Sequence, residues 1–133
     1  PYVQGDDERV TTEGEHLFLP ARMTTPFGMV LNELATNAIK HGALSLRAGK
    51  IDARWRLEQD GNLEFVWIER GGPPAAPPHE SGFGLRLVRG LIEHELDGEV
   101  TFDFEPGGLR IRLRVPMVAR LVRPQYRPSE PNP

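Results

Sequence analysis

Two stretches with apolar residues at every second position constrain the fold more than any other feature. Residues 51–57 place an apolar side chain at every second position, with charged residues between them. Residues 63–69 follow after Asp60-Gly61, a dipeptide typical of a tight hairpin turn. Alternation with a period of two indicates a β-strand with one buried face. The stretches therefore predict a β-hairpin, and apolar residues on both faces of its second strand indicate a central position in a sheet.

Two further hairpins are expected from the same pattern. Residues 100–104 and 109–115 alternate on either side of a turn that is rich in Gly and Pro. Residues 8–12 and 15–19 are shorter strand-like runs around Gly14, and they predict a hairpin at the beginning of the chain.

Two amphipathic segments separate these hairpins. The first predicted helix begins at Thr25-Pro26, where Thr can cap and Pro suits the first helical position, and it ends near His41. The second covers residues 85–96 and ends at Asp97-Gly98. Antiparallel strand pairs that alternate with two helices predict an α+β fold. We expect a two-layer sandwich in which helices pack on one face of a mixed, mostly antiparallel sheet.

The first helix carries polar residues where its apolar stripe does not require them. Glu33, Asn37 and Lys40 share one face at about 100° per residue, opposite the apolar side. Such a face can simply be solvated, with a weak ion pair between the acid and the base. Alternatively, a carboxylate and an amide oxygen on one helical face can hold Mg²⁺ together with its waters.

Two other segments could contact a nucleotide. Residues 81–84 (Ser-Gly-Phe-Gly) open the second helix, and phosphate binds readily at a helix N-terminus, although a tight packing turn explains the glycines as well. Glu69 ends a strand and could accept a hydrogen bond from the amino group of adenine, or it could be an exposed terminal residue. Residues 71–78, which are Gly and Pro with two Ala, predict a loop.

In this order and spacing, the three segments resemble the ATP-binding domain shared by sensor histidine kinases, gyrase, Hsp90 and MutL. More narrowly, they are similar to the HWE group of bacterial histidine kinases. NELATNAIKHGALS resembles the N box of that group, WIERGGP its G1 box, and SGFGLRLVRGLIEHELDGEV its G2 box. Asn32 stands where the group has its histidine, and Glu69 where most histidine kinases have Asp.

The resemblance implies the Bergerat ATP-binding fold and assigns roles to particular residues. Asn37 would be the Mg²⁺ ligand, and Glu33 would orient the phosphate acceptor or a water. Lys40 and His41 would face the phosphates. Glu69 would bind the adenine amino group, and Gly71 would let the base lie close. The remaining nucleotide-binding positions lie at the start of the second helix, where amides and one cation would contact the phosphates: Gly82, Phe83, Gly84, Leu85 and Arg86. The Pro-rich run would be a short ATP lid.

The function implied by the resemblance is transfer of the γ-phosphate of Mg-ATP to a histidine on a separate dimerisation domain, with a response regulator downstream. We expect that phosphoacceptor domain to lie upstream in a longer protein, because the chain begins at Pro1 and none of its histidines lies in a helix pair. Two alternatives stay open: an anti-sigma-factor-like serine kinase, with Glu33 as general base, and a nucleotide-binding regulatory module without transfer activity.

Composition excludes several other classes. A net charge of -3 gives no reason to expect a nucleic-acid partner, and no apolar run is long enough to span a membrane. The absence of cysteine excludes disulfides and thiolate metal sites and is compatible with a cytoplasmic location. The 133 residues suit one domain. We expect residues 1–118 to form it and the Pro-rich residues 119–133 to be a disordered tail.

Overall fold

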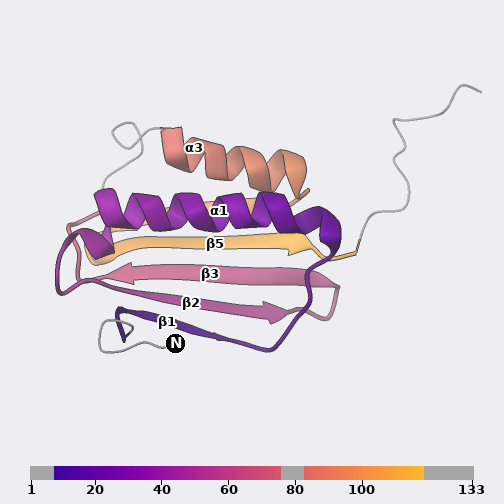
Figure 1. Ribbon diagram of the computed structural model, residues 1–133, viewed down its shortest axis with the longest axis horizontal. Coiled ribbons are helices and arrows are strands. Elements are labelled where there is room, and N and C mark those ends of the chain that lie inside the picture. The colour runs from indigo at the N-terminus through magenta and orange to yellow at the C-terminus, as the bar shows by residue number, and fades with distance from the viewer. Residues whose placement is uncertain (1–7, 76–82, 119–133) are drawn as a thin grey trace, which may run out of the picture.

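Five strands form a single mixed sheet in the order β1-β2-β3-β5-β4 (Figure 1). The computed structural model describes residues 8–75 and 83–118 of the chain. The strands are β1 (Val10–Gly14), β2 (Lys50–Leu57), β3 (Asn62–Arg70), β4 (Glu99–Glu105) and β5 (Gly108–Pro116). β3 lies in the middle of the sheet and forms a hairpin with β2, as the sequence predicts, and it also pairs antiparallel with β5. Only β1 and β2 pair in parallel among the described strands.

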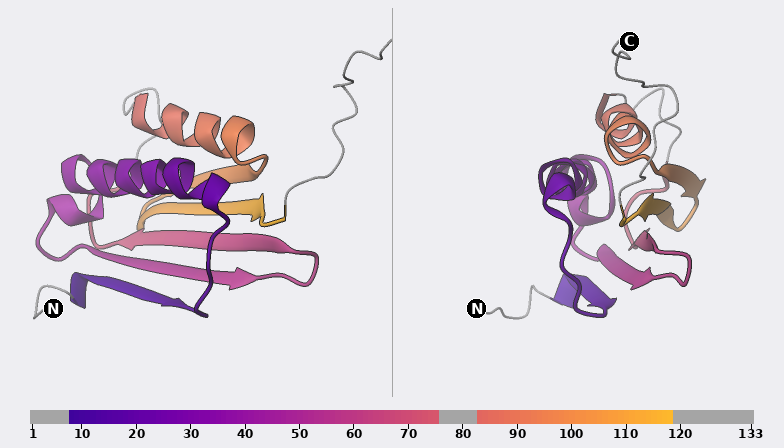
Figure 2. Two further views of the ribbon diagram at one scale, coloured as in Figure 1. Left: turned by 45° about the vertical axis from the view of Figure 1, so that its right-hand side comes forward. Right: turned by 90° about the vertical axis from the view of Figure 1, so that its right-hand side faces the viewer.

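Both long helices cover the same face of this sheet, so that the molecule has two layers (Figure 2). They are α1 (Ala21–Lys40) and α3 (Phe83–Gly90). A 3₁₀ turn, η2 (Ala43–Ser45), follows α1, and a π-helical turn, η3 (Leu91–Glu95), continues α3. The core lies between the layers and is apolar: Leu34 of α1, Val88 of α3 and Ile111 of β5 are each less than 2% exposed. This arrangement confirms the predicted α+β sandwich.

The first expected hairpin is wrong. Residues 15–20 form no strand, and β1 pairs with β2 instead of folding back on itself. The indole of Trp55 on β2 donates a hydrogen bond to the carbonyl oxygen of Glu15 at 2.9 Å. This contact holds Glu15, the residue directly after β1, beside Trp55 of β2.

The predicted start of the first helix is also wrong. α1 begins at Ala21, directly after Pro20, and Pro26 lies inside it. Met23 is completely buried against the core, and its N–H donates to the carbonyl of Pro20 at 2.9 Å. Burial of Met23 therefore gives the helix an extra turn that the capping signal at Thr25 does not reveal. Its end at Lys40 agrees with the prediction.

The outer face of the sheet, which the helices leave uncovered, is held by ion pairs between strands. Glu64 of β3 is only 8% exposed, although it is charged. Its two carboxylate oxygens accept hydrogen bonds from Arg56 of β2 at 3.0 Å and from Arg112 of β5 at 2.6 Å. Arg114 of β5 pairs in the same way with Glu58 at 2.9 Å. These pairs link the three central strands across the sheet.

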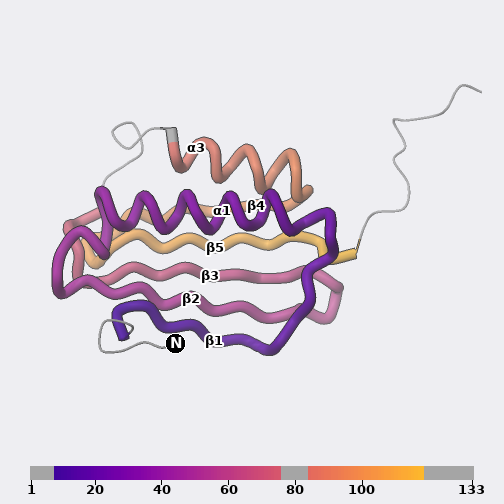
Figure 3. The backbone as a smooth tube through the Cα atoms, viewed as in Figure 1, coloured from indigo at the N-terminus to yellow at the C-terminus, as the bar shows by residue number. Residues whose placement is uncertain are grey.

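The backbone trace shows where the helical layer and the sheet meet at their ends (Figure 3). α1 finishes at the edge of the molecule where β3 also finishes, and the chain then turns through η2 into β2. The end of the helix and the end of the central strand therefore lie together, although residues 40 and 70 are far apart in sequence.

Candidate functional site

A cavity of about 290 Å³ opens where α1 and β3 end. Side chains and backbone from both layers form its wall: Asn37, His41, Gly42, Glu69, Pro73, Pro74, Ala75, Leu85, Phe104 and Leu109. Small-molecule pockets usually measure roughly 300–1,000 Å³. The enclosed part therefore suits a purine-sized group better than a whole nucleotide.

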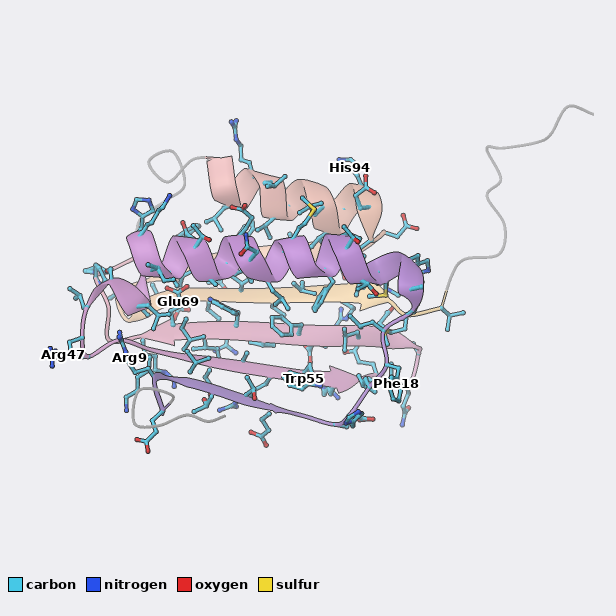
Figure 4. The ribbon with its side chains drawn as sticks, viewed as in Figure 1. Arg9, Phe18, Arg47, Trp55, Glu69 and His94 are labelled. Carbon is cyan, nitrogen blue, oxygen red and sulfur yellow. The ribbon has the colours of Figure 1, made fainter. Side chains whose placement is uncertain are left out.

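Glu69 provides the only buried charge in this wall among the described residues. It is 4% exposed, and it reaches the cavity from the end of β3 (Figure 4). Its Oε1 accepts a hydrogen bond from the backbone N–H of Ala43 at 3.0 Å. Its Oε2 accepts one from the indole Nε1 of Trp67 at 2.8 Å. A buried carboxylate with a donor on each oxygen is satisfied and fixed in place.

The end of α1 shapes the opposite side of the cavity. Asn37 is half-buried and lines it one turn before the helix ends, and His41 lines it directly after the last turn. The N–H groups of His41 and Gly42 donate back to the carbonyl of Asn37 at 2.8 and 3.1 Å. These bonds end the helix and position Gly42 next to the carboxylate of Glu69.

The loop that supplies the Ala43 donor is packed tightly against the end of β3. Gly71 has a φ of +80°, and a β-carbon there would lie 2.7 Å from the carbonyl oxygen of Ala48. The side chain of Arg9 donates to the carbonyl of Gly49 at 3.0 Å and to that of Leu46. Gly71 is needed because the loop comes so close, and it does not line the cavity itself.

Glu33 lies beside the start of α3, outside the wall of the cavity. It is half-buried on α1, one turn before Asn37. A β-carbon on Gly84 would lie 3.3 Å from its Oε1. The acidic residue of the first segment and a glycine of the third segment are therefore neighbours in space.

The structure does not bring every predicted residue to the wall. Lys40 and Arg86 are exposed and do not line the cavity. Gly82 lies outside the described residues, and of Phe83 only the backbone at the start of α3 is described. Asn32, which replaces the histidine of the HWE group, is exposed on α1 and also lies outside the wall.

Some lining residues were not predicted from the sequence. Phe104 and Leu109 face each other across the β4–β5 hairpin, and their alternation predicted only that they lie on the buried face. Gly42 was recognised only as part of a helix end. Its place against Glu69 depends on the tertiary fold, for which the sequence carries no local signal.

A second cavity, of about 420 Å³, lies near the beginning of α1. Its wall is mainly apolar and aromatic and includes Phe27, Leu31, Trp55 and Phe65. It offers no buried charge among the described residues. The smaller cavity therefore has the better arrangement of polar groups for binding a nucleotide.

Comparison with known proteins identifies the family. The family model of the histidine kinase-, DNA gyrase B- and HSP90-like ATPases matches residues 24–119, which include most of α1 together with Glu69 and α3. The chain belongs to this family. Blue-light-activated histidine kinase 1 from Erythrobacter litoralis is 40% identical over 120 residues, and the blue-light-activated histidine kinase from Brucella anthropi is 38% identical over 122.

The alignments cover most of this chain but only part of the relatives. They include 88% and 90% of the chain, but 33% of the Erythrobacter protein and 25% of the Brucella protein. Among solved structures, the histidine kinase domain of an Erythrobacter litoralis blue-light-activated kinase has a TM-score of 0.69 at 21% identity, over 81% of this chain and 54% of that one. This likeness confirms the fold of the domain. Neither α1 nor any other described helix has the length and hydropathy that would let it cross a membrane.

Proposed function

We propose that the chain is the catalytic domain of a histidine kinase and that the cavity at the end of α1 binds Mg-ATP. One observation carries the proposal: a buried, doubly hydrogen-bonded carboxylate and the half-buried amide of Asn37 line the same cavity. The identity of 36–40% with histidine kinases over nearly the whole chain supports it.

Glu69 would recognise the base. A carboxylate only accepts hydrogen bonds, and the exocyclic amino group of adenine donates them. Leu85, Phe104 and Leu109 supply apolar surface to the same cavity, which suits the faces of a purine ring. The phosphates would then extend from the cavity towards the start of α3.

Asn37 would hold Mg²⁺ through its amide oxygen. Mg²⁺ prefers oxygen ligands, and it usually binds through one or two protein groups together with substrate phosphates. The described residues contain no cluster of three His, Cys, Asp or Glu side chains able to hold a metal without a substrate. This donor set suits an ion that arrives with ATP and that would neutralise the charge of its phosphates.

Glu33 would act on the acceptor of the phosphoryl group. Its carboxylate lies beside Gly84, where the backbone of α3 begins. Such a group can orient an incoming imidazole, and positioning is the main contribution of a protein to phosphoryl transfer. The acceptor histidine would lie on a separate dimerisation domain, and a response regulator would receive the phosphoryl group from it.

A thermal-shift titration with ATP tests the binding step. With Mg²⁺ present, ATP at a hundred times its Kd should stabilise the chain by about 2.7 kcal/mol and raise its melting temperature. GTP serves as the control and should have a much smaller effect. No stabilisation by ATP at any concentration would contradict the proposal.

Transfer of labelled phosphate to an added dimerisation domain tests the catalytic step. The product should be labile in acid and stable in base, because phosphohistidine is a phosphoramidate. An acid-stable product would indicate a serine kinase instead. Binding of ATP without any transfer would indicate a regulatory module that only binds the nucleotide.

A further inference from the structure

We propose that Trp67 sets the preference of this site for adenine by fixing the Glu69 carboxylate. The inference rests on the proposed binding of ATP and goes beyond it, because it assigns nucleotide specificity to a side chain outside the wall of the cavity. Trp67 would be a positioning residue that acts through Glu69.

The contact follows from the geometry of the strand. Trp67 and Glu69 are two residues apart on β3, so their side chains point to the same face of the sheet. The indole Nε1 lies 2.8 Å from Oε2 of Glu69. Both residues are buried, at 6% and 4% exposure, so water competes little for this hydrogen bond.

The second oxygen of Glu69 is fixed from another element. Oε1 accepts from the N–H of Ala43, the first residue of η2, at 3.0 Å. One donor thus comes from the sheet and the other from the turn after α1. With both oxygens bound, the carboxylate cannot rotate about its last bond without breaking a hydrogen bond.

This restriction has a consequence for the ligand. A carboxylate offers about four lone-pair positions, and two are used by Trp67 and Ala43. The remaining positions can only accept, and they are held in a fixed direction. The amino group of adenine can donate to one of these positions. The carbonyl oxygen of a 6-oxopurine cannot donate, and it would lie against the negative charge of Glu69. Without the indole donor, the carboxylate can turn, and this discrimination weakens.

The test compares ATP with purine riboside triphosphate, which lacks only the 6-amino group. Dissociation constants of both are measured by titration calorimetry for the wild-type chain and for Trp67→Phe. The phenyl ring keeps the apolar packing and removes the donor. We expect the affinity for ATP to fall about tenfold and that for the analogue to fall less than threefold.

The Trp55→Phe variant is the matched control. Trp55 is the other tryptophan of the chain, on β2, and its indole donates to the carbonyl of Glu15 in the other cavity at 2.9 Å. Figure 4 shows it on β2, well away from Glu69 along the sheet. This substitution should leave the ratio of the two affinities unchanged.

The outcomes separate the inference from the proposed function. An equal loss of affinity for both nucleotides in Trp67→Phe, or no loss, would overturn the role of Trp67 while leaving ATP binding intact. No binding of ATP by the wild-type chain would overturn both.

A second measurement applies if Trp67→Phe does not fold. In Trp55→Phe, the one remaining indole N–H signal in an NMR spectrum belongs to Trp67. ATP should shift that signal, and purine riboside triphosphate should shift it markedly less. Equal shifts with both nucleotides would contradict the inference.

Discussion

Gly42 lies directly against Glu69: a β-carbon at position 42 would overlap the Oε1 atom of that carboxylate. The same β-carbon would lie 3.1 Å from the α-carbon of Ala38, in the last turn of α1. The end of the helix and the buried acid are thus packed without space for a methyl group. The shape of the cavity therefore depends on the absence of a side chain at position 42.

Substitution of Gly42 by Ala should therefore weaken ATP binding. The methyl group would displace Glu69 from the N–H of Ala43 and leave a buried polar group unsatisfied, which costs about 1–3 kcal/mol. Chemical denaturation measures the loss of stability, and an ATP titration measures the loss of affinity. Gly28→Ala is the control, since nothing lies within 4 Å of a β-carbon there, on α1. That change should stabilise the chain by about 0.5–1 kcal/mol.

Removal of the Asn37 amide should abolish the dependence of ATP binding on Mg²⁺. In Asn37→Ala, the melting temperature should rise equally with ATP in the presence and in the absence of Mg²⁺, because the protein ligand of the ion is lost. Asn32→Ala, on the exposed side of the same helix, should retain the difference. A Mg²⁺-dependent shift that survives in Asn37→Ala would assign the ion to another residue.

Gly84→Ala should reduce phosphoryl transfer more than nucleotide binding. Its methyl group would lie 3.3 Å from Oε1 of Glu33, closer than ordinary van der Waals contact, and would push that carboxylate aside. We expect the transfer rate to fall about tenfold with the Kd for ATP little changed. Gly90→Ala, at the end of the same helix and with open space around it, provides the comparison. Equal rates in the two variants would contradict a role for Glu33 in transfer.

The ion pairs of the outer face should make stability depend on pH. Burial would raise the pKa of Glu64, but hydrogen bonds from Arg56 and Arg112 outweigh it and lower the pKa below the ordinary value of 4.5. Because the folded-state pKa is depressed, the stabilisation is fully present above pH 4.5 and is lost as the pH falls through the lowered pKa.

Glu64→Gln tests this dependence. Both arginines are more than half exposed, so the variant should lose about 1 kcal/mol of unfolding free energy at pH 7. The difference from wild type should shrink below pH 4.5 and disappear as the pH falls through the lowered pKa, where the carboxylate becomes protonated in the folded wild type as well. Urea denaturation at several pH values measures this difference in unfolding free energy. Glu95→Gln, at an exposed position on η3, is the control. A difference that is constant with pH would show that charge is not its cause.

The strands could be predicted where one face is buried and the other is solvated. β2, β3 and β5 begin and end within about a residue of the alternating pattern, because register determines which side chains enter the core. The beginning of the chain lacks such a pattern. Its parallel pairing with β2 and the early start of α1 depend on the burial of Met23 and on the bond from Trp55 to Glu15, contacts that no local pattern encodes.

The site was predictable to the extent that its residues belong to recognisable segments. Asn37, His41, Glu69 and Leu85 meet at one cavity, as expected for segments that share a ligand. The contribution of Phe104 depends on how the β4–β5 hairpin lies against that cavity. The roles of all these residues, those of Lys40 and Arg86, and membership of the HWE group stay predictions.

A crystal structure of the chain with a non-hydrolysable ATP analogue and Mg²⁺ tests the central claim most directly. The account predicts the adenine amino group within hydrogen-bond distance of Glu69 and the metal on the amide oxygen of Asn37. Adenine in the apolar cavity beside Trp55, or a base whose amino group does not contact Glu69, would contradict it.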